Sequence, residues 1–327
     1  MKFPEFSLSH PAGGNRSAHH PAEQQKISKM ASFNPGHILT HFRIQEKIAE
    51  GGMGVVYKAL DLNLQRPVAL KFLPPHLSAQ AKKKQQFLAE ARLISSLDHP
   101  YICTVHEIFE TDDQSLVMVM PCYNGRTLRD YQNHKGLNQS DAIAVTKQIA
   151  CGLAKAHGHD IVHQDVKPDN IIVTDDDIVK IIDFGIAKLA NGKNRGDISG
   201  TAAYMSPEQL NGGDVDQRTD IWSLGVLFYE MLSGKLPFDG EYEQVIVYSI
   251  IKEEPQPLKN VSKGLQQIVF KCLSKNPAER YQSMRDLMTA IEIHLAREKY
   301  ATRAGKEENR SGSSRLFSGV AFLTFGT

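Results

Sequence analysis

The stretch HQDVKPDN, residues 163–170, decides the fold that we expect for this chain of 327 residues. It places two carboxylates, a lysine and a carboxamide close together, and Pro168 restricts the backbone between them. Asp165 is suited to accept a proton from a hydroxyl group, Lys167 can neutralise charge on a phosphoryl group, and Asn170 offers a neutral oxygen to a magnesium ion. The stretch therefore predicts a loop that supports phosphoryl transfer.

A second carboxylate follows two apolar segments, predicted to be strands, between Ile171 and Ile182. This is Asp183 of the tripeptide DFG, and a carboxylate is the hard ligand that Mg²⁺ prefers. Residues 175–177 are aspartates without the alternating spacing of a calcium loop, so they predict a solvated hairpin turn. We interpret His163 as a packed structural imidazole, because Asp165 already supplies the base.

Glycines gather in AEGGMGVV, residues 49–56, between two predicted strands. Glycine lets backbone amides approach a polyphosphate without a Cβ clash, although the same composition also suits an ordinary tight turn. The segment is not a Walker A loop, because the pattern G-x-x-x-x-G-K-[ST] does not occur in the chain.

Lys71 ends the apolar strand segment VALK, which begins at Val68. A buried ammonium group is costly unless it is paired, so Lys71 needs an anion. Glu90, on a helix predicted over residues 79–97, and a nucleotide phosphate are the expected partners. The alternative is a lysine whose end reaches solvent.

Composition excludes several classes of function. Lys and Arg number 38 against 37 for Asp and Glu, so overall charge gives no sign of a nucleic-acid or anionic-membrane partner. The four cysteines are far apart in sequence and indicate neither a disulfide framework nor a zinc site. The most apolar run, residues 221–232, is too short to span a bilayer. We therefore expect a cytoplasmic protein without a membrane span.

Changes in pattern along the chain predict its domains. Residues 1–41 have the composition of a disordered N-terminal tail. Residues 42–123 predict a small β-rich lobe with one main helix, and residues 124–296 predict a larger helical lobe. Residues 297–327 are expected to be a C-terminal tail. Helices in the larger lobe are predicted at about residues 139–157, 219–233, 243–252, 262–273 and 283–298.

The motifs AEGGMGVV, VALK, Glu90, HQDVKPDN, DFG, GTAAYMSPE and DIWSLG occur in this order. The set resembles the signature of the protein kinase superfamily and is most similar to bacterial eukaryotic-like serine/threonine protein kinases. The resemblance covers roughly residues 42–296 and implies an α+β, two-lobed protein-kinase-like fold. It also implies transfer of the γ-phosphoryl group of MgATP to Ser or Thr hydroxyls of a protein substrate, and leaves a homodimer open.

The resemblance implies a role for each matching position. Lys71 would hold the α and β phosphates, Glu90 would orient Lys71, and Asp165 would be the base. Asn170 and Asp183 would hold magnesium, and Lys167 and Thr201 resemble the serine/threonine subclass. Met120 would be the gatekeeper, and the backbones of Pro121 and Tyr123 would meet the adenine edge. The residues expected around the nucleotide are Ala49, Gly51, Gly52, Gly54, Val56, Ala69, Lys71, Met120, Pro121 and Tyr123. Two structural roles are also implied: Glu208 would pair with Arg280, and Asp220 would brace the catalytic loop.

Two positions depart from the family pattern. Ala49 replaces the usual first glycine, which should stiffen the loop while Gly51 and Gly54 remain. Gln164 replaces an arginine that, in many relatives, is satisfied by a phosphate on the activation loop. Glutamine has no charge to neutralise. We therefore hypothesise that the activation loop, which includes Ser199, does not need phosphorylation to become ordered.

Two other functions compete with protein phosphorylation. The missing arginine and glycine would suit a nucleotide-binding pseudokinase or scaffold, although the complete set of catalytic side chains opposes that interpretation. A small-molecule phosphotransferase on a related fold would keep the catalytic aspartates. GTAAYMSPE, which resembles a peptide-binding loop, opposes the latter.

Overall fold

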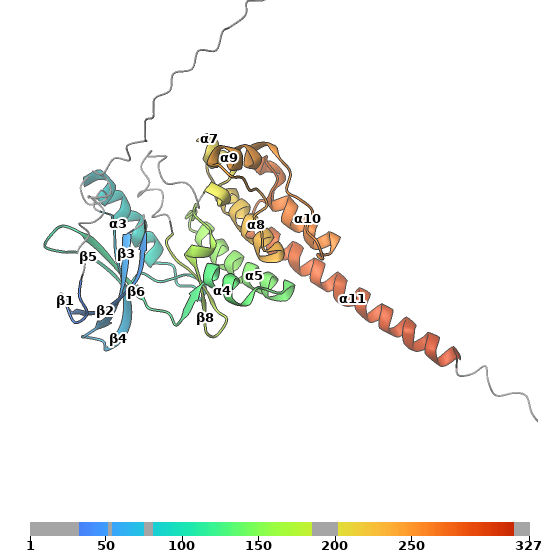
Figure 1. Ribbon diagram of the computed structural model, residues 1–327, viewed down its shortest axis with the longest axis horizontal. Helices are drawn as coiled ribbons and strands as arrows, with labels where there is room; N and C mark the ends of the chain where they lie inside the picture. The colour runs from blue at the N-terminus through green and yellow to red at the C-terminus, as the bar shows by residue number, and fades with distance from the viewer. Residues whose placement is uncertain (1–32, 52–53, 75–80, 185–201, 317–327) are drawn as a thin grey trace, which may run out of the picture.

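The strands predicted at the start of the N-terminal lobe form the centre of a six-stranded antiparallel sheet. The computed structural model of the protein describes residues 33–51, 54–74, 81–184 and 202–316. In sheet order, the strands are β1 (Ile38–Leu39), β2 (Phe42–Gly51), β3 (Gly54–Asp61), β4 (Arg66–Phe72), β6 (Leu116–Pro121) and β5 (Glu107–Glu110). Figure 1 shows this lobe beside the helical lobe, as the predicted α+β architecture requires.

The two faces of β4 have different partners, because successive side chains of a strand point to opposite faces. Val68, Leu70 and Phe72 lie in an apolar cluster with Tyr57 of the neighbouring strand. Ala69 faces the other way, into a cluster that includes helix α3 (Ala81–Ser95). The alternation places Lys71, two residues from Ala69, on the same face as this second cluster.

The predicted N-terminal tail overlaps with residues that belong to the sheet. Leu39 of β1 pairs with Phe42 of β2, so regular pairing begins before the predicted boundary at residue 42. The ring of Phe33 lies 5.0 Å from that of Phe72 and 5.7 Å from that of Tyr57. Burial of this aromatic ring gives residues 33–41 the apolar contact that their composition did not indicate.

The C-terminal lobe is mainly helical and is built around α8. Its helices are α4 (Leu128–Lys135), α5 (Gln139–His157), α7 (Pro207–Asn211), α8 (Gln217–Ser233), α9 (Glu243–Lys252), α10 (Lys263–Cys272) and α11 (Met284–Leu316). Short 3-10 helices are η1 (Pro168–Asn170), η2 (Ala202–Tyr204) and η3 (Pro277–Glu279). A small antiparallel sheet contains β7 (Gly125–Thr127), β8 (Ile171–Thr174) and β9 (Val179–Ile181).

Helix α8 is buried over most of its length, as expected of a helix that is apolar on all sides. It begins at the Asp216 N-cap, whose carboxylate accepts a hydrogen bond from the Arg218 amide, and ends at Gly234 in the left-handed conformation. Trp222 is fully buried and stacks on Phe238, with ring centroids 5.7 Å apart. This helix is the base on which the catalytic loop and the SPE segment rest.

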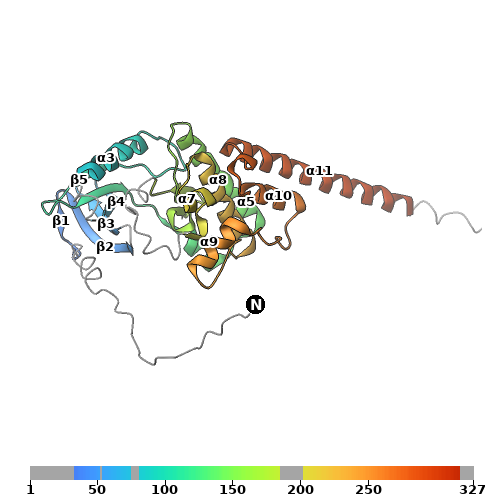
Figure 2. The same ribbon diagram turned by 90° about the horizontal axis from the view of Figure 1, so that it is seen from above.

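Helix α11 runs further than the sequence predicted. It was expected to end near residue 298, but it continues to Leu316, so the predicted domain boundary at 296/297 lies inside it. The charged residues after Arg297 include many good helix formers and no proline, which explains how a segment without an apolar stripe continues the helix. Figures 1 and 2 both show α11 extending away from the two lobes.

Among the described residues, no helix combines the length and the apolarity that crossing a bilayer requires.

Candidate active site

The catalytic loop and the DFG segment lie side by side at the junction of the two lobes. Residues 168–170 of the loop form η1, and its last residue leads directly into β8. The backbone oxygen of Asn170 accepts a hydrogen bond from the Ile182 amide at 3.0 Å. This bond places the backbone of Asn170 beside Ile182, the residue before Asp183. That Asn170 and Asp183 hold one ion stays a prediction.

Asp165 lies at the centre of the loop and is buried, with 6% of its surface exposed. Its Oδ2 atom is 2.9 Å from the Lys167 ammonium nitrogen and accepts a hydrogen bond of 2.8 Å from the Asn170 Nδ2 atom. Asn170 Nδ2 also donates to the backbone oxygen of Asp165 at 2.8 Å. The carboxylate is therefore held in one orientation by a cation and an amide.

Lys71 joins the two lobes through an ion pair. Its Nζ atom is 2.6 Å from Oδ2 of Asp183, and only 5% and 11% of the two side chains are exposed. The sequence predicted that this buried ammonium group would need an anion. The structure supplies Asp183, whose backbone adopts a left-handed φ of 64°.

The predicted pair of Lys71 with Glu90 is not formed in this structure. Glu90 is half-buried on α3 and accepts a hydrogen bond from Gln86 Nε2 at 3.2 Å. The residues of α3 that are buried are Phe87, Ala91 and Ile94, which leaves Glu90 at the edge of the inward face. Lys71 instead has its counter-charge in Asp183, and this contact removes the electrostatic need for Glu90.

Cross-strand register brings the predicted nucleotide-binding positions of the sheet together. Val56 pairs with Ala49 on one side and with Lys71 on the other, and Ala69 pairs with Met120. Met120 is 7% exposed, and it lines a small cavity together with Cys103 and Phe184. Pro121 and Tyr123, which follow Met120, are both half-buried at the junction between lobes.

The glycine turn has one position at which glycine is required by packing. Gly54 has φ of 118°, and a Cβ atom there would lie 1.9 Å from the carbonyl oxygen of Phe72. Around Gly51, no heavy atom of the described residues beyond its chain neighbours lies within 4 Å of such a Cβ. Gly54 therefore lets β3 pass close to β4, whereas this packing does not require glycine at position 51. Gly52 and Thr201 lie outside the described residues.

His163 is a packed structural residue, as predicted. It is fully buried, and its ring lies 4.5 Å from that of Phe184. The Asp165 amide donates to His163 Nδ1 at 3.2 Å, and Nε2 lies 3.0 Å from the carbonyl oxygen of Ile182. Since a carbonyl only accepts, Nε2 carries the proton. His163 thus connects the catalytic loop to the DFG segment.

Asp220 braces the catalytic loop from α8, as the resemblance implied. The carboxylate is fully buried and accepts hydrogen bonds of 2.8 Å from the backbone amides of His163 and Gln164. It also contacts Nε2 of His157 at 2.8 Å. Gln164 has a left-handed φ of 65°, which is uncommon for a residue other than glycine. The hydrogen bonds that these two backbone amides donate to Asp220 hold the backbone in this conformation.

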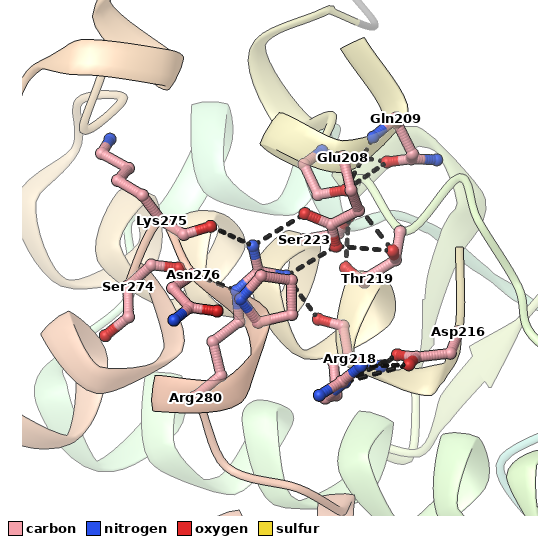
Figure 3. Close-up of polar contacts among 12 residues, drawn as sticks. Glu208, Gln209, Asp216, Arg218, Thr219, Ser223, Ser274, Lys275, Asn276 and Arg280 are labelled. Atoms are coloured by element: carbon pink, nitrogen blue, oxygen red, sulfur yellow. Dashed lines mark hydrogen bonds and ion pairs between the residues drawn. The ribbon is translucent and has the colours of Figure 1, made fainter. Parts of the chain in front are cut away.

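Glu208 and Arg280 form the second predicted structural contact (Figure 3). Arg280 donates to the two carboxylate oxygens of Glu208 at 2.7 and 2.8 Å, in a bidentate pair. Its side chain is fully buried, and it also donates to the backbone oxygens of Ser274 and Arg218. Although burial opposes ionisation, the Arg280 hydrogen bonds and charge hold the pKa of Glu208 below its ordinary value of 4.5.

Sequence reasoning missed two contacts of the catalytic loop. Arg129 on α4 donates to Glu230 at 2.8 Å and to the Tyr204 hydroxyl at 2.9 Å, and lies 3.4 Å from Asp169. No local sequence pattern predicts these contacts of Arg129, because its partners are far from it in the chain. Gln209 of α7 donates to the backbone oxygen of Gln164. For this residue the capping-box pattern Ser-x-x-Gln was a usable signal.

Comparisons with known proteins agree with this geometry. Residues 42–290 match the protein kinase domain family. The chain is 37% identical over 278 residues to the serine/threonine-protein kinase PknA of Mycobacterium tuberculosis, an alignment that covers 82% of this chain and 63% of PknA. It is 35% identical over 259 residues to the probable serine/threonine-protein kinase CPE1738 of Clostridium perfringens, covering 77% of this chain and 38% of that protein.

A solved structure gives the same fold. The crystal structure of the Mycobacterium tuberculosis PknI kinase domain matches with a TM-score of 0.64 and 24% sequence identity, over 80% of this chain and 99% of that one. The chain therefore belongs to the protein kinase domain family. Members of this family use ATP as phosphoryl donor, together with a divalent metal, and phosphorylate proteins.

The shifted pKa of Glu208 leads to a prediction about stability. Because the folded pKa lies below 4.5, the ionised pair stabilises the fold above that pH, and its contribution is lost as pH falls through the folded pKa. Glu208→Gln should lower the free energy of unfolding at pH 7 by about 3–5 kcal/mol, since it leaves a buried guanidinium unpaired. Urea denaturation of both proteins from pH 7 to below the ordinary pKa of Glu208 measures the effect.

The exposed Glu254 provides the matched control. Glu254→Gln should follow the wild type at every pH, whereas Glu208→Gln should lose less stability than the wild type on acidification. Equal pH dependence in Glu208→Gln and the wild type would contradict the role of the ion pair.

Proposed function

We propose that this chain is an active serine/threonine protein kinase, which transfers the γ-phosphoryl group of MgATP to Ser or Thr hydroxyls of proteins. The chain spans 38% and 63% of the length of the two relatives described above, so the activity of the whole protein is part of the proposal. The observation that carries it is a linked set of contacts: Lys71 pairs with Asp183, the Ile182 amide beside Asp183 donates to the backbone of Asn170, and Asn170 in turn donates to the Asp165 carboxylate.

Asp165 is the proposed general base. Its carboxylate would accept the proton of the substrate hydroxyl as that oxygen attacks phosphorus. Lys167, 2.9 Å from this carboxylate, would neutralise charge on the phosphoryl group in transfer. Asn170 orients the carboxylate through its amide nitrogen, so the base and its supports are already assembled.

The donor set suits a magnesium ion. Asn170 directs Nδ2 toward Asp165, which leaves its amide oxygen as a ligand, and Asp183 offers a carboxylate. A Mg²⁺ ion that is bound together with nucleotide phosphates usually takes only one or two ligands from the protein, which these two oxygens would supply. A bound ion would neutralise charge on the β and γ phosphates, and Asn170 and Asp183 would hold it there.

Nucleotide binding would require the Lys71–Asp183 pair to open. Lys71 would turn to the α and β phosphates, and Asp183 would turn to the metal. Glu90 would then become the protein anion for Lys71, after a movement of α3 toward the sheet. The adenine edge would meet the backbones of Pro121 and Tyr123, beside Met120, with Ala49, Gly51, Gly52, Gly54, Val56 and Ala69 around the remaining nucleotide.

Asp165→Asn tests the function directly. The variant should keep its fold and nucleotide binding, but kcat should fall by about 10²–10⁴, because the carboxamide cannot accept the hydroxyl proton. Purified protein is incubated with ATP, Mg²⁺ and a protein substrate, and phosphosites are mapped by mass spectrometry. Asp176→Asn, at an exposed turn position, is the matched control and should retain wild-type kcat.

Absence of phosphoprotein in the wild-type reaction, despite nucleotide binding, would favour the pseudokinase interpretation. Phosphate found only on small molecules would favour a small-molecule phosphotransferase. Equal phosphorylation by Asp165→Asn and the wild type would remove Asp165 from the mechanism.

Glu90→Gln tests the exchange of partners by Lys71. Since Glu90 contacts Gln86 in this structure, the free energy of unfolding should change by no more than about 0.5 kcal/mol. The value of kcat/KM for ATP should nevertheless fall by about tenfold or more, because the nucleotide-bound lysine loses its anion. Steady-state kinetics and urea denaturation of the same samples separate the two effects, with Glu254→Gln as control. Unchanged kinetics would show that Lys71 does not use Glu90.

We also propose that activity does not depend on phosphorylation of the activation loop. In support, Gln164 carries no charge, and its backbone amide and carbonyl groups both have protein partners. Ser199 and Thr201, the candidate phosphate acceptors, lie outside the described residues.

Ser199→Ala should therefore keep kcat/KM on a protein substrate within about tenfold of the wild type, because Gln164 has no positive charge that a phosphate on Ser199 would neutralise. Kinetics are measured on unphosphorylated wild type and on the variant. A larger loss that phosphorylation of wild-type Ser199 reverses would reject the proposal.

A cytoplasmic location is a further part of the proposal. Its support is chemical: all four cysteines are free thiols, as in proteins of a reducing compartment. Fractionation of cells, with immunodetection of the full-length chain, would test it.

A further inference from the structure

Gln164 is the residue immediately before the base, and its strained backbone requires support on both sides. Its amide group donates to Oδ1 of Asp220 at 2.8 Å. Its carbonyl group belongs to the peptide unit that carries the Asp165 amide, so the direction of this carbonyl sets the orientation of Asp165. A second contact must fix that carbonyl if the left-handed conformation at φ of 65° is to persist.

Gln209 supplies the second contact. Its Nε2 atom donates to the carbonyl oxygen of Gln164 at 2.9 Å. Its Oε1 atom accepts from the Ser206 amide at 2.9 Å, and the Gln209 amide donates back to Ser206 Oγ. These reciprocal bonds form a capping box at the start of α7. Because Oε1 faces a donor and Nε2 faces an acceptor, both ends of the carboxamide have the partners that their chemistry requires.

A chain of polar contacts continues from Gln209 into the core. Ser206 is fully buried, and its Oγ lies 3.4 Å from Oγ1 of Thr219. Thr219 donates to Oε1 of Glu208 at 2.8 Å, and Glu208 forms the bidentate pair with Arg280. Figure 3 shows Gln209, Glu208, Thr219 and Arg280 within this one set of contacts. The carbonyl of Gln164 is thereby connected to the buried ion pair of Glu208 and Arg280.

The geometry points to Gln209 as a positioning residue for Asp165, an inference that rests on the proposed kinase function. Gln209 does not touch the reacting atoms. It holds the Gln164 carbonyl, and with Asp220 on the amide side it keeps the peptide before the base in a single orientation. The neutral carboxamide of Gln209 therefore connects the catalytic loop to the SPE segment without an ion pair.

The decisive variant is Gln209→Glu, which keeps Oε1 as acceptor for the Ser206 amide and replaces only the Nε2 donor. At neutral pH a carboxylate oxygen would face the Gln164 carbonyl. We expect kcat to fall by about tenfold or more with little change in KM for ATP, because a misplaced base slows the chemical step. Hydrogen exchange at the amides of Gln164 and Asp165, followed by mass spectrometry, should become faster in the same variant.

The dependence on pH distinguishes positioning from general destabilisation. When it is protonated, the carboxyl group introduced by Gln209→Glu can donate to the Gln164 carbonyl, whereas the ionised form cannot. The ratio of kcat in Gln209→Glu to kcat in the wild type should therefore rise as pH falls toward the pKa of this carboxyl group. Gln209→Met, which has similar volume and no strong donor, should be slow at every pH. It also keeps the test open if the charged variant does not fold.

Gln244→Glu, on the exposed face of α9, controls for an added negative charge and should retain wild-type kcat and exchange. Wild-type kcat and unchanged exchange in both Gln209 variants would overturn the inference. If the wild type itself transfers no phosphate, the proposed function fails. The exchange measurement still decides whether Gln209 holds the loop.

Discussion

The buried carboxylate of Asp220 is the constraint on which the rest of the site depends. It is fully removed from solvent, so its charge must be met by hydrogen bonds, and it receives them from two successive backbone amides of the catalytic loop and from His157. Those bonds hold Gln164 in a conformation that it would otherwise avoid. A charge in the core thus fixes the backbone immediately before Asp165, the proposed base, and helix α8 provides the rigid support.

The remaining buried contacts extend this principle through the helical lobe. Arg280 brings the SPE segment to the same helix, and His163 joins the catalytic loop to DFG through its two ring nitrogens. Each connection uses a group that is buried and fully engaged, so none of them can rotate without leaving an unsatisfied partner. The side chains of the candidate site can therefore keep fixed relative positions, although they come from distant parts of the chain.

Much of this arrangement was predictable because it depends on local pattern. The strand, turn and helix signals placed β2 to β4, α5 and α9 close to their observed ranges. The shared hold of Asn170 and Asp183 on magnesium stays a prediction. The contacts that were missed depend on tertiary packing. Glu90 was expected to satisfy Lys71 because both face inward, but the sequence does not reveal the angle at which α3 lies, and Asp183 took its place. Phe33 is similar, since a single aromatic residue in a polar segment does not disclose which ring it will meet.

The Lys71–Asp183 contact has a consequence for affinity. It joins a strand of one lobe to a loop of the other. Under the proposed function, this ion pair would compete with the nucleotide and its metal for Lys71 and Asp183. The apparent dissociation constant of the nucleotide would then equal the intrinsic constant divided by the fraction of molecules in which the Lys71–Asp183 ion pair is open. A partner that binds elsewhere and favours the open form of the Lys71–Asp183 ion pair would therefore increase nucleotide affinity without contacting the nucleotide.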